Sequence, residues 1–449
     1  MEVPGGGVEP RSRPPRSSFM PRYIALVALA LRIAPAPPAA AQDDPVLASR
    51  AAYQDAVRAY QAHDVAAFLR YATEAQRLRP AHGGTTYALA SAYAMAGDTG
   101  AAFAMLRRFA ALGYSADVGA DSDLVVLRGT PAFDDVRRAL SRNAAPLVRG
   151  TPAFTLPERD LLTEGIAYDP ASRSFFVGSV HRRKILRVDR HGRSTEFVPS
   201  GTGGLWAPLG MRVDPVRRVL WVAAAALPQM ADFDPADSLR SGLFRFDLSG
   251  GALTGRFLLP ADGAPHLLGD VTLTRGGDVY ATDSRGPAIY RVRAGADSLE
   301  RFLESPLLLS AQGLALDPAE RTLYVADYAR GILHVDLASR EVRRMGVGDD
   351  VLALGIDGLY AVGRELVGIQ NGIGPYRVVR LRLDAPGDRI VSVEVLERAR
   401  PDYAEPTLGV VVGDELSYVA NSQWERFRED GGIDAPEELR APLVLRLRL

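Results

Sequence analysis

The side chains best suited to chemistry are three carboxylates, each at or near the start of a similar short stretch of the chain. Glu164 begins EGIAYDP, Asp270 follows Gly269 in GDVTLT, and Asp357 begins DGLYAV. Carboxylates that converge on a narrow axis repel one another when ionised, so either a pKa rises or a cation lies among them. With the amide oxygen of Gln312 they form an all-oxygen set, which suits a hard divalent cation such as Ca²⁺.

Other reactive side chains are scarce. The chain has no cysteine and six histidines, which argues against a zinc-type nitrogen and sulfur site. His266, in the segment APHLLGD, is a candidate general base beside a metal-bound water, with Asp270 as a supporting acid. The alternative is that His266 is an ordinary surface residue. No glycine-rich phosphate loop, nucleophile elbow or HExxH motif is present.

These residues must be positioned by six related units, each of which reads as a β-strand, a turn and a second β-strand. The unit QGLALDPAERTLYVAD shows the pattern, and successive units begin 43 to 60 residues apart. A unit of this kind cannot bury its own apolar face, and its period is that of a propeller blade with four strands. The sequence predicts an all-β, six-bladed propeller whose units begin at Glu164, Leu209, Gly269, Gln312, Asp357 and Thr407.

In a propeller, the first strand of each blade begins, and the second strand ends, on the same face of the domain. A second ring of polar residues then borders the channel, and two long segments, Leu227–Ser241 and Gln423–Pro442, are placed to roof it. The candidate ligand-pocket residues are Trp206, Asp283, Asp327, Asn371 and Asn421. A structural role is the alternative for four of these aspartates. Asp283 and Asp327 would form turns, and Asp270 and Asp357 would cap the turns that enter their strands.

The motifs Glu164-Gly165, Gly269-Asp270, Gln312-Gly313-Leu314 and Asp357-Gly358 resemble the metal ring of the regucalcin/gluconolactonase family (senescence marker protein type). The resemblance covers roughly Phe154 to Leu449. It implies a divalent cation in the channel that polarises a lactone or ester carbonyl for attack by water. Glu164 and Asp357 match its ligands directly, Gln312 replaces the family's Asn, and Gly269 replaces a further Asn.

The first 150 residues are organised differently. Residues 1–41 read as an export signal, with a possible true start at Met20 and a cleavage site at Ala39-Ala40-Ala41 before Gln42. Residues 45–141 contain two segments, Ala52–Pro80 and Thr86–Tyr114, that align at an offset of 34 and resemble a pair of tetratricopeptide repeats. A helix at Ala132–Leu140 would cap them, and 142–152 would link them to the propeller at 153–449. The sixth unit ends at its third strand, so Phe154–Pro157 would supply the outer strand that closes the ring.

Two functions follow as hypotheses. The first is a periplasmic or secreted propeller that binds a divalent cation and a small ligand in its channel, and this hypothesis extends to hydrolysis of a lactone or ester. The alternative is a non-catalytic scaffold, in which the helical repeats bind a protein or peptide partner. The alternative for those helices is a packing spacer against the propeller. A net charge of −1 without a basic run excludes nucleic acid as an expected partner, and we expect no transmembrane segment in the mature chain.

Overall fold

The computed structural model describes residues 44–348 and 350–449, and in these residues six antiparallel sheets follow one another along the chain. Blade one contains β2 (Thr163–Asp169), β3 (Ser174–Ser179), β4 (Lys184–Val188) and β5 (Ser194–Val198). Blade two contains β6 (Ala207–Asp214), β7 (Val219–Ala225), β8 (Ser241–Asp247) and β9 (Leu253–Leu258). Blade three contains β10 (Leu268–Leu273), β11 (Val279–Asp283), β12 (Ala288–Val292) and β13 (Glu300–Glu304). The strands of each blade pair in sequence order.

The other three blades repeat this order with local additions. Blade four contains β14 (Ala311–Leu316), β15 (Thr322–Asp327), β16 (Gly331–Asp336) and β17 (Val342–Arg344). Blade five contains β19 (Ile356–Val362), β20 (Glu365–Gln370), β21 (Arg377–Leu383) and β22 (Arg389–Arg398), and the short β18 (Gly346–Val347) pairs with β22 in parallel. Blade six contains β23 (Gly409–Val412), β24 (Glu415–Val419) and β25 (Leu443–Arg448). The predicted six-bladed propeller is therefore confirmed.

Blade six is completed by a strand from the other end of the domain. β1 (Thr151–Thr155) pairs antiparallel with β25, with Thr151 opposite Arg446 and Phe154 opposite Val444. The sequence places this strand at Phe154–Pro157, so its role is confirmed while its start lies three residues earlier. The backbone N–H of Leu156 still donates to the carbonyl of Pro442 at 2.9 Å. The pairing leaves no open edge where the ring closes.

The apolar core of the propeller lies between neighbouring sheets. One cluster joins blades two and three through Trp221, Ala223, Val271 and Ala281, and another joins blades three and four through Tyr280 and its neighbours. Strands buried on both faces in this way read as apolar runs, as in VLWVAAA and TLYVAD. Short 3-10 turns occupy the connections: η1 (Ser122–Leu127), η2 (Thr202–Gly204), η3 (Pro235–Asp237), η4 (Trp424–Arg426) and η5 (Pro436–Glu438).

The helical domain consists of two helix pairs and a further helix. The pairs are α3 (Pro45–Gln61) with α4 (Val65–Leu78) and α5 (Gly83–Met95) with α6 (Thr99–Ala111). The side chains of Asp64 and Asp98, which are 34 residues apart, cap α4 and α6 by accepting the backbone N–H groups of Ala67 and Ala101. Small buried alanines lie where the helices cross: Ala56, Ala72, Ala88 and Ala92. This agrees with two helical repeats, and their assignment as tetratricopeptide repeats stays a prediction.

The expected capping helix is α7 (Pro131–Ala144), which extends into the segment predicted as a linker. Its buried residues Val136 and Leu140 join the cluster that contains Leu106 and Phe109 of α6. The predicted export signal lies outside the described residues. No described helix combines the length and apolar character needed to cross a membrane.

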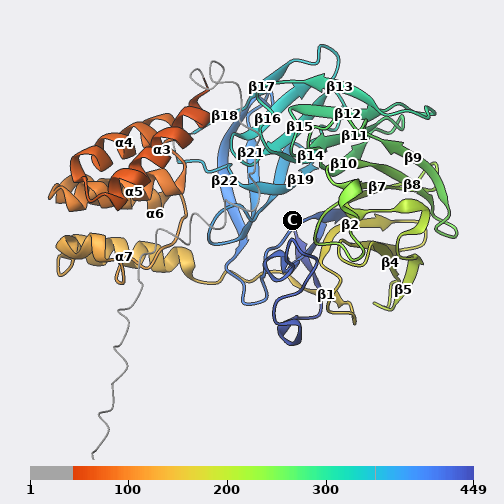
Figure 1. Ribbon diagram of the computed structural model, residues 1–449, viewed down its shortest axis with the longest axis horizontal. Helices are drawn as coiled ribbons and strands as arrows, with labels where there is room; N and C mark the ends of the chain where they lie inside the picture. The colour runs from red at the N-terminus through yellow and green to blue at the C-terminus, as the bar shows by residue number, and fades with distance from the viewer. Residues whose placement is uncertain (1–43, 349) are drawn as a thin grey trace, which may run out of the picture.

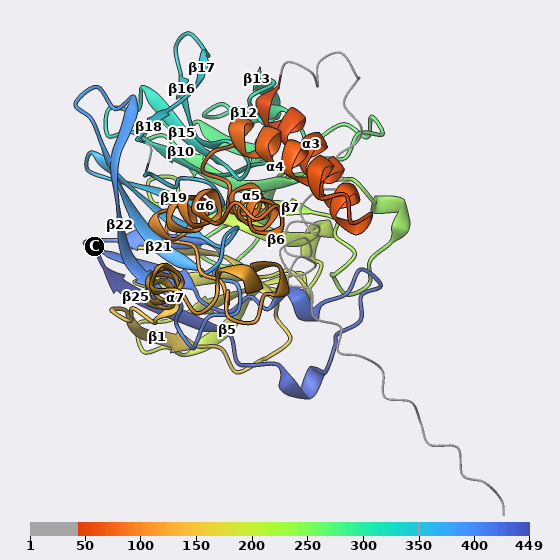
Figure 2. The same cartoon turned by 90° about the vertical axis from the view of Figure 1, so that its left-hand side faces the viewer.

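The helical domain packs against blades four and five, on the face where first strands begin and second strands end. Figure 1 shows the helices gathered at one side of the sheets, and in Figure 2 they lie in front of them. Asp44 forms an ion pair with Arg330, just after β15, and Nη2 of Arg79 donates to the carbonyl of Ala329 at 2.9 Å. Leu352, between the two blades, belongs to the same apolar cluster as α6 and α7. The domain therefore covers part of the face to which the candidate site opens.

Candidate functional site

The first strands position the candidate residues by a shared irregularity. In blades one to five, the pairing of the first and second strands shifts register at one place. The residue pairs at these shifts are Glu164-Gly165, Leu209-Gly210, Gly269-Asp270, Gln312-Gly313 and Asp357-Gly358. A β-bulge takes a side chain out of the regular alternation and re-aims it. Five of the six predicted unit starts therefore lie at equivalent bulges, and we call the residues at these bulges the inner ring.

The glycines in these pairs allow the first strands to approach one another at the axis. A Cβ added to Gly165 would clash with the carbonyl group of Leu209 in the next blade, and one added to Gly313 would clash with the backbone of Asp357 and Leu359. Close approach of two backbones requires glycine. The glycines thus draw the first strands, and with them the acids of blades one, three and five, in toward the axis.

Glu164 and Asp357 come from blades one and five and are both buried, with exposed fractions of 9% and 7%. Nε1 of Trp424 donates to Oε2 of Glu164 at 2.6 Å, and Nδ2 of Asn371 donates to Oδ2 of Asp357 at 2.7 Å. Burial raises the pKa of Glu164 well above its usual range, and the charge of Asp357 adds to this effect. Burial also raises the pKa of Asp357 to about 7, against the hydrogen bond from Asn371. These two predicted ligands are brought together.

Asp270 occupies a different position because its motif has the reverse order, Gly-Asp. It takes the place that glycine holds in the other bulges, and it lies against Gly210 of blade two. Oδ1 accepts the N–H of Val271 at 2.8 Å, whereas the buried Oδ2 has no hydrogen-bond partner. Burial raises the pKa of Asp270 to about 6, while the positive charge of Arg212 opposes the rise. The negative charge of Asp270 also raises the pKa of Asp357.

The side-chain amide of Gln312 forms hydrogen bonds with two serines and not with the acids. Nε2 donates to Oγ of Ser310 at 3.2 Å, and Oε1 accepts a hydrogen bond from Oγ of Ser284 at 3.4 Å. In the described part of the chain, no recorded contact joins its amide to Glu164 or Asp357. The predicted three-residue ligand set is therefore not assembled, although its two carboxylates are neighbours.

The donor set fits a hard cation by its chemistry, since buried carboxylates without a positive partner favour one. Within residues 44–348 and 350–449, however, no group of three or more His, Cys, Asp or Glu side chains is placed to hold a metal ion. Glu164 and Asp357 are the residues whose burial and position fit cation binding, and further ligands would have to come from water or from a bound molecule.

Of the predicted ligand-pocket residues, Asp283, Asp327 and Asn421 are structural, whereas Asn371 lies at the site. Asp283 accepts the backbone N–H groups of Leu267, Arg285 and Gly286, and Asp327 accepts four backbone N–H groups in the equivalent corner of blade four. Both side chains thus stabilise turns, which was the alternative to a role in the ligand pocket. Asn421 holds the backbone of Ala441 and Leu443. Asn371 alone contacts an inner-ring acid.

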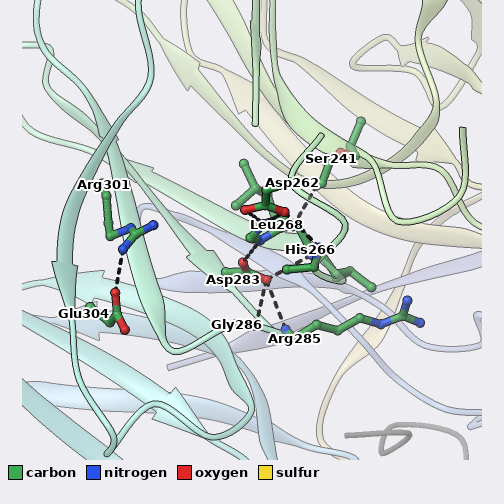
Figure 3. A network of polar contacts seen from close by, with 12 residues as sticks. Ser241, Asp262, His266, Leu268, Asp283, Arg285, Gly286, Arg301 and Glu304 are labelled. Carbon is green, nitrogen blue, oxygen red and sulfur yellow. Dashed lines mark hydrogen bonds and ion pairs between the residues drawn. The ribbon is translucent and has the colours of Figure 1, made fainter. Parts of the chain in front are cut away.

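His266 lies in a polar network that Figure 3 shows from close by. Nδ1 lies 2.6 Å from Oδ2 of Asp283, Nε2 lies 3.4 Å from Asp262, and the ring packs edge-on against Tyr290 of β12. The hydrogen bond to Asp283 raises the pKa of His266. No contact recorded for the described residues joins it to Glu164, Asp270 or Asp357. His266 therefore lies toward the third strand of its blade and is not placed as a base for the axial acids.

Trp206 is likewise directed away from the inner ring. Nε1 donates to Oδ2 of Asp237 at 3.0 Å, in the long Leu227–Ser241 segment, and Arg240 lies over the ring. The other long segment does reach the axis, because Trp424 within it donates to Glu164. Phe427, Leu439 and Met230 from the two segments share one apolar cluster, so both segments belong to a single roof.

Sequence reasoning missed several residues beside the acids. Glu405 lies on the connection into blade six, and burial together with the charge of Asp357 raises its pKa to about 7. The hydroxyl of Tyr328 donates to Oδ1 of Asn371, and Tyr376 lies near Glu405 and Glu425. We call Glu405, Glu425, Tyr328, Tyr376 and Trp424 the mouth residues. Their one sequence signal is that each lies on a connection at the predicted mouth face.

The chain matches no model of a protein family and no curated protein. A gluconolactonase from Xanthomonas campestris is 16% identical, covers 68% of this chain and 94% of its own, and gives a TM-score of 0.44. A calcium-binding regucalcin from Agrobacterium tumefaciens is 18% identical over 67% and 93% of the two chains, with a TM-score of 0.45. A virginiamycin B lyase from Staphylococcus aureus is 15% identical over 66% and 83%, with a TM-score of 0.44. By its own strand order, the chain is a six-bladed β-propeller preceded by a helical domain.

Proposed function

We propose that the protein binds a divalent cation and a small ligand at the mouth of its propeller channel, and that it hydrolyses a lactone or ester there. One observation carries the proposal: two buried carboxylates from separate blades, Glu164 and Asp357, lie together with no basic side chain among the groups that shift their pKa values. Two such groups repel each other when ionised, and a bound cation removes that repulsion. Ca²⁺ fits oxygen donors of this kind.

The residues of the chain have separate tasks in this proposal. Glu164 and Asp357 would hold the cation, which when bound would polarise a carbonyl oxygen of the ligand. The hydrogen bonds from Trp424 and Asn371 each engage one carboxylate oxygen, and no other described residue forms a hydrogen bond with the second oxygen of either acid. The roof segment that carries Trp424 limits access of water to the mouth. His266 takes no part.

Thermal unfolding in the presence and absence of Ca²⁺ tests the cation site. We expect Ca²⁺ to raise the melting temperature of the wild type, because a ligand that binds only the folded state stabilises it. The double variant Glu164→Gln, Asp357→Asn should lose this effect, and hydrolysis of a panel of lactones and aryl esters should be lost with it. An identical melting curve of the wild type with Ca²⁺ and with chelator would remove the proposal.

A scaffold function for the helical domain is the second candidate. Val125 and Val126 on η1 are adjacent, and 60% and 51% of their surface is exposed, which is unusual for side chains of this type. We propose that they contribute to a surface for a protein or peptide partner. A pull-down with the full chain should recover a partner that is lost in the variant Val125→Ser, Val126→Ser, and equal recovery by both proteins would contradict this role.

A further inference from the structure

His181 lies at the corner that follows β3 of blade one, and the proposed chemistry does not use it. Its side chain is buried, and 7% of the residue is exposed. Its backbone N–H donates to the carbonyl of Leu161, just before β2, at 3.3 Å. His181 is therefore attached to the part of blade one that carries Glu164.

Both the imidazole and the backbone of His181 bind the first roof segment, Leu227–Ser241. Nδ1 lies 2.7 Å from the carbonyl oxygen of Gln229, and because a carbonyl oxygen can only accept, Nδ1 carries the proton of this hydrogen bond. The carbonyl of His181 accepts the backbone N–H of Ala231 at 2.7 Å. These two bonds lie on either side of Met230, whose buried side chain belongs to the apolar cluster of the roof. The first roof segment is thus fixed to blade one through its backbone.

The same imidazole contacts the second roof segment, Gln423–Pro442. It packs against the ring of Phe427, with the two ring centroids 5.2 Å apart. The N–H of Phe427 donates to the carbonyl of Trp424 at 3.0 Å, so Phe427 closes the short turn η4 from which Trp424 donates to Glu164. His181 therefore joins the two roof segments and supports the turn that brings an indole N–H to a candidate cation ligand.

The second roof segment is a loop whose two ends are held together. Nε2 of Gln423 donates to the carbonyl of Arg440 at 3.1 Å, and Oε1 of Gln423 accepts the N–H of Arg440 at 2.9 Å. Further along the loop, Phe427 pairs with Ile433 in an antiparallel bridge. A loop that is closed at its base and packs on itself can move as one unit about that base.

We propose that His181 is a positioning residue that locks the two roof segments together, and that release of this lock opens the mouth to the ligand. In the closed state the imidazole holds the first segment by a hydrogen bond and the second by the ring of Phe427, and Trp424 stays on Glu164. When the second segment swings away about its base, Trp424 leaves Glu164 and the mouth opens. The inference rests on the proposed function for the ligand that enters, and it adds how entry is controlled.

Hydrogen exchange of the full chain, followed by mass spectrometry with chelator present, tests the lock. His181→Ala should speed amide exchange at least tenfold in both roof segments and leave the strands of blades three and four unchanged, because a local opening keeps the rest of the fold protected. His181→Asn keeps a donor near the position of Nδ1 but has no ring, so protection should return in the first segment alone. His181→Phe keeps a ring but has no donor, so protection should return in the second segment alone. His191→Ala is the matched control, since His191 is exposed in the turn between β4 and β5 of the same blade, and it should match the wild type.

Calorimetric titration with Ca²⁺ measures how the lock acts on the site. His181→Ala should weaken Ca²⁺ binding three- to tenfold, as Trp424→Phe should, because both variants remove the same indole N–H from Glu164. The double variant should bind Ca²⁺ no more weakly than either single variant, since residues that act through one another are not additive. Additive losses in the double variant would overturn the idea that His181 acts through Trp424.

The two proposals can fail separately. Equal exchange in the roof segments of the wild type and His181→Ala would overturn the lock, whatever the protein binds. A rise in exchange that extends over the whole propeller would also overturn it, because His181 would then be a general stabilising residue. A wild-type protein that does not bind Ca²⁺ would overturn the cation site, and the exchange measurements would then decide the lock alone.

Discussion

Replacing Asp357 by asparagine should stabilise the cation-free protein at alkaline pH. The side chain of asparagine keeps the size of Asp357 and an oxygen that accepts the N–H of Asn371, but it carries no charge. In the folded protein the pKa of Asp357 is raised from 3.8 to about 7. When the pH is above both pKa values, this difference corresponds to about 4 kcal/mol less free energy of unfolding for the wild type. Relaxation around the charge reduces the effect, so we expect a gain on the order of 2 to 4 kcal/mol.

The sign follows from the protons bound in each state. Between pH 4 and pH 7 the folded state keeps the proton of Asp357 while the unfolded state has released it. The stability of the wild type therefore falls as the pH rises through this window and is lowest above it. The advantage of Asp357→Asn should be largest at pH 8 and should vanish near pH 4.

Urea unfolding followed by tryptophan fluorescence, in buffers with chelator at pH 5 and pH 8, measures the difference. Asp414→Asn is the control, because Asp414 is an exposed acid in the turn between β23 and β24. With Ca²⁺ at pH 8 the order should reverse, since the wild type gains stability by binding the ion and the variant does not. A variant that is less stable than the wild type at pH 8 with chelator would refute the idea that Asp357 is an uncompensated buried charge.

Three further predictions concern single residues. Trp424→Phe removes the N–H that orients Glu164 and should weaken Ca²⁺ binding three- to tenfold in a calorimetric titration, while an unchanged affinity would remove Trp424 from the site. Asp283→Ala leaves three backbone N–H groups without their acceptor. It should destabilise the protein by about 2 to 4 kcal/mol in urea unfolding, while the affinity for Ca²⁺ should be retained. A folded variant that no longer binds Ca²⁺ would instead place Asp283 in the site. Gly165→Ala forces a Cβ into the carbonyl of Leu209 and should cost more than about 2 kcal/mol, so wild-type stability in this variant would contradict the close approach of blades one and two.

The propeller could be predicted because each unit repeats the same apolar pattern and the same turn chemistry. The start of a first strand was recognisable from the pair of a polar residue and a glycine, and these pairs coincide with the bulges. The closing strand was predicted three residues too late, because Thr151 and Pro152 carry no strand signal of their own. Pro152 is tolerated because it lies in the outermost strand of blade six.

The site was predicted less completely, for reasons of geometry. Glu164 and Asp357 were found because the residue at a bulge is fixed by its repeat. The position of His266 on a connection between blades predicts that it lies on the mouth face of the propeller, but it does not predict its distance from the axis. The structure places it beside Tyr290 of the third strand of blade three. Glu405 lies outside the repeated pattern, so nothing in its local sequence indicates that Asp357 is its neighbour.

The strand that completes blade six joins the first and the last of the described strands in the order of synthesis. β1 is made before the other strands of all six blades, whereas its partner β25 is made after every other described strand. The circle of sheets can therefore close only once all six blades have been synthesised, and until then β24 and β1 each present an unpaired edge to other chains. A variant that lacks β25 should consequently persist as an open arc that self-associates, with its helical domain already folded.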